Sequence, residues 1–324
     1  MSTTHPDSTL VADVGGTHAR AGVVTRPGEP PAQIFKRRTG DFDGLEAFLD
    51  AALAALSEAP RPNRVLCAVA SPLDHDPIEL TNAGWRFSPA AVARHLRLEQ
   101  VRCLNDWVAQ GWAVTRLRSD DRRCIYPGIS DPEAPRLALG PGTGLGSALI
   151  TPIAGGWQVY ATEGGHISFA AHDAREWAIA EHIEQRFGHC SAERLASGIG
   201  IEAIDRALHA IAGTSPVHTS AEAIARDAMA GDRHCREVLG HMTDALGSAA
   251  GDLALATGAR GGIYFGGGII PALGDCFDWE RLHRRFVAKG RFEDYLAAIP
   301  IHTITHPAPA LMGLSAYLLA NRPM

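Results

Sequence analysis

The sequence lacks several features that define specialised classes of protein. No run of 18 or more uninterrupted apolar residues occurs, so we expect no transmembrane helix. The first residues, MSTTHPD, form neither a basic nor an apolar region, and we expect no secretory signal. Lysine and arginine number 30 against 36 acidic residues, a net charge of −6, which argues against binding nucleic acid through overall charge.

Cysteine is sparse and scattered. The six cysteines form no CxxC pair, which favours reduced core thiols in a cytoplasm over disulfides or a structural zinc site. The cysteines are Cys67, Cys103, Cys124, Cys190, Cys235 and Cys276.

The rest of the composition is ordinary for a folded protein. With 324 residues, 46% of them hydrophobic and 20% charged, the chain predicts a globular protein of two domains. Residue patterns predict strands intermixed with helices, which indicates the α/β class. The predicted strands are 9–14, 19–24, 65–70, 101–104, 137–139, 147–150, 157–162, 263–265 and 301–304. The predicted helices are 44–56, one opening after Ser88, 107–117, 173–187, 233–257 and 309–319.

Glycine is abundant, at 34 residues, and it gathers in turns that follow strands. The first such turn is Asp13-Val-Gly-Gly-Thr17, between two strands of a predicted hairpin. Gly15 and Gly16 let backbone amides approach a phosphate, and Thr17 adds a hydroxyl. Asp13 is a candidate to hold Mg²⁺ through water. The alternative is a tight hairpin turn with a capping Asp.

The second turn, Gly140-Pro-Gly-Thr-Gly-Leu-Gly146, contains spacing like that of a dinucleotide fingerprint. Such a fingerprint opens a helix, whereas a strand is predicted here at 147–150. No Gly-Lys-Ser/Thr of a Walker A motif occurs in the chain. We therefore favour a strand–turn–strand phosphate contact through Gly142, Thr143 and Gly144 over a plain structural turn.

The third turn is Gly266-Gly-Gly268, directly after the predicted strand 263–265. Glycines there would let a flat adenine or ribose lie against the backbone. An ordinary strand-to-helix turn explains the same residues.

Polar residues at the ends of other strands suggest a site for a polyhydroxylated ligand, because each hydroxyl both donates and accepts. Asp106 is placed to accept a hydroxyl proton while Asn105 orients the ligand, although Asp106 could instead cap a helix. Glu163 and His166 flank two glycines, and the alternative there is a polar turn.

Two further segments contribute candidates for the same ligand. Ser191 is expected to cap a helix, which would place Glu193 at the second helical position, near the positive end of the helix dipole. Asn82 offers another amide.

Taken together, these segments resemble the bacterial glucokinase family, within the wider actin/hexokinase/sugar-kinase fold. They occur in the family's order and span most of the chain. The segments are ADVGGTHAR (12–20), LTNAGWRFS (80–88), CLNDW (103–107), LGPGTGLGSAL (139–149), EGGHISFA (163–170), SAERLASGIG (191–200), YFGGGIIP (264–271) and ITHPAPALMGLSAYL (304–318).

The resemblance implies a two-domain, ribonuclease H-like α/β fold with an interdomain cleft. A small domain, 1–109 plus 305–324, would hold the phosphate loop and the catalytic Asp. A large domain, 110–304, would hold the sugar and adenosine contacts. The family suggests a homodimer. The cysteine usage, charge and apolar runs described above predict a cytoplasmic protein with no nucleic-acid or membrane partner.

The resemblance also implies a reaction, the phosphorylation of glucose by MgATP to glucose 6-phosphate in the first step of glycolysis. Asp106 would be the general base toward the 6-hydroxyl. Glucose would be bound by Asn82, Asn105, Asp106, Glu163, His166 and Glu193. ATP would be bound by Ala12, Asp13, Val14, Gly15, Gly16, Thr17, Gly142, Thr143, Gly144, Gly267 and Gly268, with Mg²⁺ held by Asp13 through water.

Other readings stay open at this point. The sequence departs from the family pattern at Trp107, Ile199 and Gly266, where the family usually has Phe, Pro and Ala, which leaves a kinase for another hexose or an amino sugar. A non-catalytic sugar sensor on the same fold is the remaining alternative. Sensors of the related repressor/open-reading-frame/kinase family carry an N-terminal DNA-binding segment, for which the phosphate motif at Asp13 leaves no room. That family's cysteine-rich zinc motif is also absent.

Overall fold

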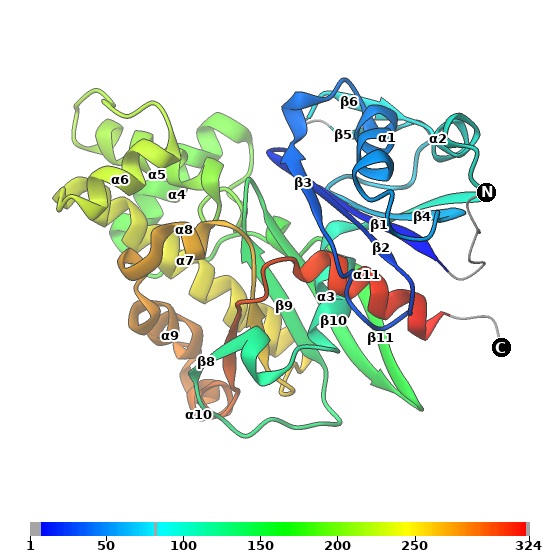
Figure 1. The fold of residues 1–324 in the computed structure, drawn as a ribbon. Coiled ribbons are helices and arrows are strands. Elements are labelled where there is room, and N and C mark those ends of the chain that lie inside the picture. The colour runs from blue at the N-terminus through cyan, green and yellow to red at the C-terminus, as the bar shows by residue number, and fades with distance from the viewer. Residues whose placement is uncertain (1–7, 81–82, 322–324) are drawn as a thin grey trace. The chain divides into compact units, whose positions relative to one another are not determined.

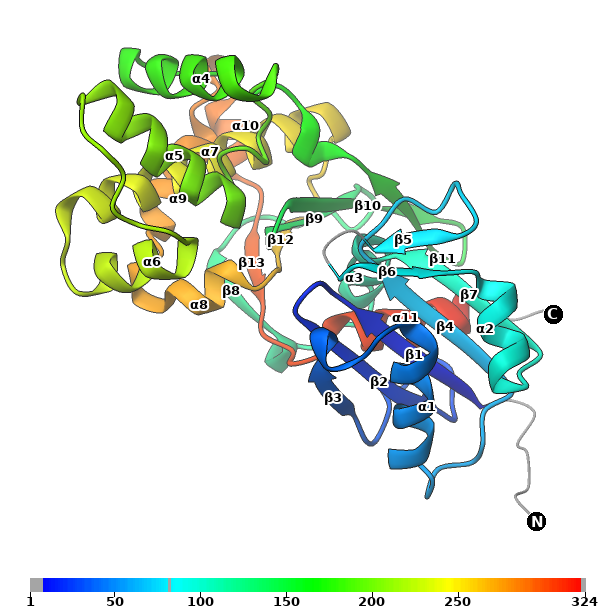
Figure 2. The same cartoon turned by 90° about the horizontal axis from the view of Figure 1, so that it is seen from above.

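The computed structural model describes residues 8–80 and 83–321, and its contacts divide the chain into two compact units. The first unit comprises residues 1–122, 153–161 and 305–324, and the second comprises 123–152 and 162–304. Figures 1 and 2 show the elements of each unit.

The first unit is built on a five-stranded sheet in the order β3-β2-β1-β4-β7. Strands β1 and β2 form an antiparallel hairpin, whereas β1, β4 and β7 run parallel to one another. The strands are β1 (Thr9–Val14), β2 (His18–Val24), β3 (Phe35–Arg38), β4 (Arg64–Val69) and β7 (Gln100–Asn105). A small separate pair consists of β5 (Ile78–Leu80) and β6 (Trp85–Phe87).

Helices cover both faces of this sheet (Figure 2). Side chains alternate along β1, so that Leu10, Ala12 and Val14 pack toward α1 and α2, while Val11 packs toward α3 and α11. The helices are α1 (Leu45–Ala55), α2 (Pro89–Leu96), α3 (Asp106–Val114) and α11 (Pro309–Ala320). A Cβ at Gly313 of α11 would collide with the Ala109 backbone of α3, so glycine is what lets these helices approach.

The second unit holds a mixed sheet in which β10, β9, β12, β13 and β8 follow one another. Strands β9, β12 and β13 are parallel, and β10 is antiparallel to β9. The strands are β8 (Arg122–Tyr126), β9 (Arg136–Pro141), β10 (Leu145–Ile153), β12 (Ile263–Phe265) and β13 (Ile301–Ile304), and the sheet order continues beyond β10 to β11 (Gly156–Thr162).

A long helix, α7, organises the second unit. It runs through the core and contacts α5, α6 and α9, while α4 packs on α5 (Figure 1). The helices are α4 (Ala174–Phe187), α5 (Gly198–Ile211), α6 (Ala221–Met229), α7 (Arg233–Thr257), α8 (Ile269–Leu273), α9 (Trp279–Val287) and α10 (Glu293–Ala297). Single 3-10 turns lie at Thr39–Asp41, Ser119–Asp121, Gly164–His166, Gly274–Cys276 and Gly290–Phe292.

The α/β class is confirmed, and the listed strands and helices are present with bounds shifted by a few residues, whereas the helix expected after Ser191 begins later, as α5. The sequence prediction missed β3, β5, β6, β8, α6, α9 and α10. Strand β3 was missed because its FKRR sequence is largely exposed and basic, which hides the usual alternation.

The cysteines agree only in part with the expectation of core thiols. All six are free, and Cys67, Cys190 and Cys235 are buried, whereas Cys103 and Cys276 are half-buried and Cys124 is exposed on β8. Among the helices formed by the described residues, none combines the length and apolarity needed to cross a bilayer.

Candidate active site

The turn between β1 and β2 holds the first predicted phosphate loop. Its first amide is used internally, since Gly15 N–H donates to the His18 carbonyl at 3.1 Å. Thr39, which is fully buried, braces the turn from outside: its hydroxyl donates to the Gly15 carbonyl at 2.7 Å and its N–H to the Thr17 carbonyl at 3.0 Å. Sequence reasoning missed Thr39, because no motif surrounds it.

Asp13 lies one residue before the end of β1 and is largely buried. It faces Arg20 across the hairpin, with Arg20 Nη1 3.1 Å from Asp13 Oδ2. Burial raises the pKa of Asp13 above its ordinary value, and the Arg20 guanidinium opposes that rise. The expected alternative, an Asp that caps the turn, is replaced by this cross-strand ion pair.

Asn105 and Asp106 join β7 to α3. Asn105, not Asp106, is the N-cap residue: its Oδ1 accepts from the N–H groups of Trp107 at 2.9 Å and Val108 at 3.2 Å. Asp106 Oδ1 also accepts from Trp107 N–H at 2.9 Å. The helix start therefore fixes both side chains at the end of the strand.

The strand register brings these two segments to one edge of the sheet. Val14 of β1 pairs with Val69 of β4, and Val69 pairs in turn with Asn105 of β7. The three parallel strands end level, so Gly15 and Asp106 follow at the same edge with one strand between them. At about 4.8 Å per strand, their backbones are roughly 10 Å apart.

The second glycine turn joins β9 to β10 in the other unit. Gly142 N–H donates to the Gly144 carbonyl at 2.8 Å, and the Gly142 carbonyl accepts from Gly198 N–H at 2.9 Å. A Cβ at Gly142 would meet its nearest atom only at 4.0 Å, whereas a Cβ at Gly144 would collide with the Glu193 carboxylate. The turn is therefore open at Gly142 and closed at Gly144.

The third turn divides in the same way. Gly267 has a φ of +84°, and a Cβ there would collide with the Pro141 backbone, while a Cβ at Gly140 would collide with Gly266. These glycines serve the close packing of two turns. Gly268 has open space where its Cβ would lie, so it is the position at which a ligand can approach the backbone.

The polar candidates of the second unit gather around the start of β10. Glu193 Oε2 accepts from Leu145 N–H at 2.9 Å, and Glu193 N–H donates to the Gly165 carbonyl at 2.8 Å. Glu163 and His166 are exposed on the neighbouring 3-10 turn, with His166 Nε2 3.8 Å from Glu163 Oε2. A Cβ at Gly165 would collide with the Leu145 carbonyl, which is why the turn can lie on the strand.

The expectation of a helix beginning at Ser191 is wrong. Residues 191–197 form turns, and α5 begins at Gly198 with Ser197 as its N-cap, its hydroxyl accepting from Gly200 N–H at 3.0 Å. Glu193 is therefore not at a helix terminus, and its carboxylate caps the glycine turn instead. Asn82, the remaining predicted sugar contact, lies outside the described residues.

The two α/β units, with mixed sheets and glycine turns at strand ends, define a protein of the actin-like ATPase fold, as in known sugar kinases. A ROK hexokinase from Thermus thermophilus shares this fold at a TM-score of 0.68 with 19% identity, covering 97% of this chain and 100% of that one. A glucokinase from an Antarctic psychrotroph aligns with a TM-score of 0.83 and 32% identity, covering 98% of this chain and 100% of that one.

Sequence relatives agree with the structural ones. Residues 10–321 match the family described as Glucokinase. The glucokinase of Chromobacterium violaceum is 42% identical over 321 residues, 98% of this chain and 92% of its own length, and that of Paramagnetospirillum magneticum is 39% identical over 310 residues, 94% and 96%. The chain belongs to the glucokinase family, and it is a kinase with glucokinase activity, the ATP-dependent phosphorylation of glucose.

Proposed function

We propose that Asp106 is the general base of this reaction and that it acts on the 6-hydroxyl of glucose. The observation that supports the proposal is the level ending of β1, β4 and β7, which places Asp106 at the same sheet edge as the Gly15 turn. A carboxylate there can accept the hydroxyl proton while the oxygen attacks the γ-phosphorus of ATP, and ADP leaves. The product is glucose 6-phosphate.

Positioning is the main task of a phosphoryl-transfer enzyme, and α3 supplies it. Asn105 Oδ1 is held by two backbone N–H groups of the helix, so its amide nitrogen is the group that can donate to a sugar hydroxyl. The same helix start orients Asp106 through Trp107 N–H. The base and its neighbour are thus oriented before the sugar binds.

The second unit supplies the remaining proposed sugar contacts. Glu163 and His166 are exposed on one turn, and Glu193 is tied to the same turn through Gly165. Two carboxylates and an imidazole offer both acceptors and donors, which suits a ligand whose hydroxyls do both. Asn82 is proposed as a further contact from its motif alone.

The glycine turns are the proposed ATP contacts. Gly15, Gly16 and Thr17, preceded by Ala12–Val14, would face phosphates, and so would Gly142, Thr143 and Gly144. Gly267 and Gly268 would lie near adenosine, with Gly268 as the open position. The division into a small domain with the base and a large domain with sugar and adenosine contacts is part of this proposal.

The Asp13 carboxylate fits the proposed role of holding Mg²⁺ through water. Mg²⁺ binds carboxylate oxygens and keeps several waters, and Asp13 lies two residues before the first glycine of the turn. Arg20 contacts Oδ2, and Oδ1 is the oxygen proposed to bind a hydrated ion. When bound, Mg²⁺ neutralises charge on the transferring phosphates.

A coupled ADP-release assay with MgATP and a panel of hexoses and amino sugars tests the function. Turnover that depends on glucose, with a silent blank lacking sugar, is the expected result. Turnover with another sugar but not with glucose would contradict glucose as the substrate. Sugar binding without turnover would favour a non-catalytic sugar sensor. Light scattering of the same sample tests the homodimer, and cell fractionation tests the cytoplasmic location.

A further inference from the structure

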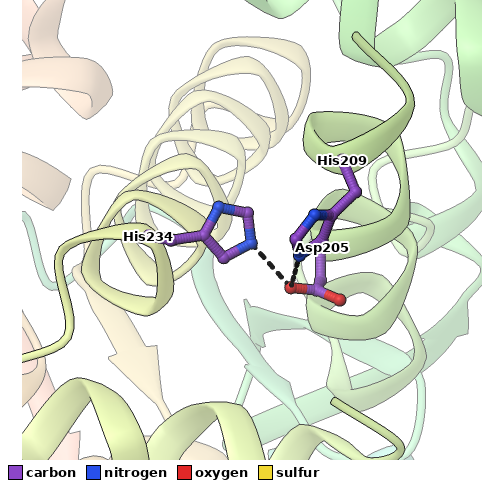
Figure 3. Close-up of side chains that lie close together, drawn as sticks. All are labelled: Asp205, His209 and His234. Atoms are coloured by element: carbon purple, nitrogen blue, oxygen red, sulfur yellow. Dashed lines mark hydrogen bonds and ion pairs between the residues drawn. The ribbon is translucent and has the colours of Figure 1, made fainter. Parts of the chain in front are cut away.

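Within the second unit, a cluster of histidines surrounds one buried aspartate further along α5 from Gly198. Asp205 and His209 lie on α5 four residues apart, which puts them on one face of the helix. His234 is the second residue of α7, and His218 lies between α5 and α6. Figure 3 shows His209 and His234 directed toward the Asp205 carboxylate from two different helices.

Three ring nitrogens converge on a single oxygen. Measured to Asp205 Oδ1, His234 Nε2 lies at 2.7 Å, His218 Nδ1 at 3.5 Å and His209 Nε2 at 3.7 Å. The Asp205 side chain is only 2% exposed, and those of His218 and His209 are 11% and 14% exposed. The His234 side chain is 30% exposed, so the cluster is reachable from solvent on that side. Such convergence of imidazoles on one buried carboxylate is a donor set for a metal ion.

Two of these nitrogens have no hydrogen-bond partner. His209 Nε2 and His218 Nδ1 are both buried and both unpaired, and they are the nitrogens that face Asp205. A buried polar atom without a partner destabilises the folded chain, so two such atoms aimed at one carboxylate point to a missing ligand between them. Asp205 Oδ1 lies 3.7 and 3.5 Å from these two nitrogens, beyond the distance of a good hydrogen bond, whereas His234 makes a short one at 2.7 Å.

In His209 and His218, the ring nitrogen that faces away from Asp205 contacts another polar side chain. His209 Nδ1 lies 2.7 Å from Thr214 Oγ1, and His218 Nε2 lies 3.3 Å from Asp227 Oδ2. Histidines that bind metals are oriented in this way, with the outer nitrogen on a hydroxyl, carbonyl or carboxylate and the inner one toward the ion. The cluster therefore has outer as well as inner partners of a metal site.

We propose that Asp205, His209 and His234 bind one divalent transition-metal ion of the zinc class, beside His218, which faces the same carboxylate oxygen. Tetrahedral Zn²⁺ with bonds of about 2.0–2.1 Å places its ligand atoms roughly 3.3 Å apart. The separation of 3.7 Å between His209 Nε2 and Asp205 Oδ1 is close to that ligand-to-ligand spacing. The 2.7 Å contact of His234 is a hydrogen bond that the ion would replace.

A second cluster of carboxylates and a histidine in the same unit is a useful comparison, because arginine side chains neutralise its carboxylates. Glu176, His241 and Asp244 also come together. There, Arg281 makes a two-point ion pair with Asp244 and Arg285 pairs with Glu176 at 2.9 Å. Asp205 has only histidine partners among the charged groups of the described residues, so no arginine or lysine occupies the place where an ion would lie.

The ion would tie α5 to the first turn of α7, which is a stabilising role separate from the phosphoryl-transfer residues. The sequence prediction of no structural zinc rested on cysteine motifs. This site uses imidazole and carboxylate instead, from positions too far apart in sequence to form a motif.

The first test uses the unmutated chain without a purification tag. The protein is stripped with chelator, dialysed against buffered Zn²⁺ and measured by mass spectrometry for metal content, and a parallel sample is titrated with Co²⁺. We expect one ion per chain, a higher Tm with the ion, and the intense visible absorption of tetrahedral Co²⁺. Failure to retain metal, or the weak spectrum of an octahedral surface ion, would overturn the proposal.

The second test assigns the ligands. In the variant His209→Gln/His234→Gln, affinity for Zn²⁺ should fall by at least about tenfold. The control is His95→Gln, because His95 Nε2 makes the same 2.7 Å contact with an aspartate, Asp50, at an exposed site. The control should keep the ion. Equal metal content in both variants would contradict the assignment, and if the double variant does not fold, the Co²⁺ spectrum of the unmutated chain decides.

Discussion

The carboxylate of Glu193 accepts a hydrogen bond from the backbone N–H of Leu145 at 2.9 Å, directly after the Gly142–Gly144 turn. The same residue holds Gly165 through its own N–H. One residue thus links a proposed phosphate turn, through its side chain, to the turn that bears Glu163 and His166, through its backbone N–H. Because the bond is to a charged acceptor, its loss should affect both groups of contacts.

Substitutions at Glu193 test this link. Glu193→Gln keeps an oxygen for Leu145 N–H, so the ATP KM should change little while the glucose KM rises. Glu193→Ala leaves that N–H unpaired, and a bond to a charged group is worth about 1.5–3 kcal/mol, so both KM values should rise by roughly tenfold or more. Steady-state kinetics measures both, and identical behaviour of the two variants would contradict the link.

Replacing the proposed base should abolish chemistry but not binding. Asp106→Asn keeps the size of the side chain and an acceptor for Trp107 N–H, so the helix start should persist. General-base catalysis contributes about 10²–10⁴ in rate, and kcat should fall by that factor or more. Glucose affinity, measured by calorimetry, should remain. Near-normal turnover would remove Asp106 from the mechanism.

The exposed pair on the 3-10 turn is expected to act on sugar binding. Glu163→Gln and His166→Ala should raise the glucose KM about tenfold, with a smaller effect on kcat, since each removes one hydrogen bond to a hydroxyl. Both side chains are exposed, so Tm should stay near that of the unmutated chain. An unchanged glucose KM would show that these residues do not contact the sugar.

Neighbouring glycines offer a matched comparison for adenosine. Gly267→Ala places a side chain at a residue with φ +84°, where it would also collide with the Pro141 backbone. It should therefore lower the free energy of unfolding by about 1 kcal/mol or more. Gly268→Ala has open space and should leave stability intact while raising the ATP KM. Urea unfolding and kinetics separate the two effects. An unchanged ATP KM in Gly268→Ala would place adenosine elsewhere.

A buried histidine predicts pH-dependent stability. Burial, helped by Arg281, lowers the pKa of His241 below its ordinary 6.5, against the opposing charges of Asp244, Glu237 and Glu176. The unfolded chain therefore binds a proton more readily, so stability is full above pH 6.5 and decreases as pH falls below it. Urea midpoints at pH 7 and 5.5 should differ less in His241→Gln than in the His95→Gln control. Equal shifts of the urea midpoint in the two variants would show that His241 does not cause the pH dependence of stability.

Much of the fold could be predicted because its information is local. The hairpin β1–β2 and the helix α11 follow from alternation, turn glycines and a proline at the helix start. Edge strand β3 could not be predicted. Its side chains are mostly exposed, so they do not alternate between apolar and polar as in a strand that packs on a core. The start of α5 was misplaced because two serines, Ser191 and Ser197, both suit an N-cap, and only packing selected the second.

The sequence by itself determined which chemistry is available: glycine turns after strands, Asp106 at the end of β7, and carboxylates and imidazoles in motifs, since these depend on neighbouring residues. Tertiary structure decided which groups meet. It placed Glu193 on a turn 48 residues earlier and His234 on Asp205 across 29 residues, and it left Gly142 and Gly268 open while closing Gly144 and Gly267. Such partners are set by the packing of distant segments, and sequence spacing carries no record of them.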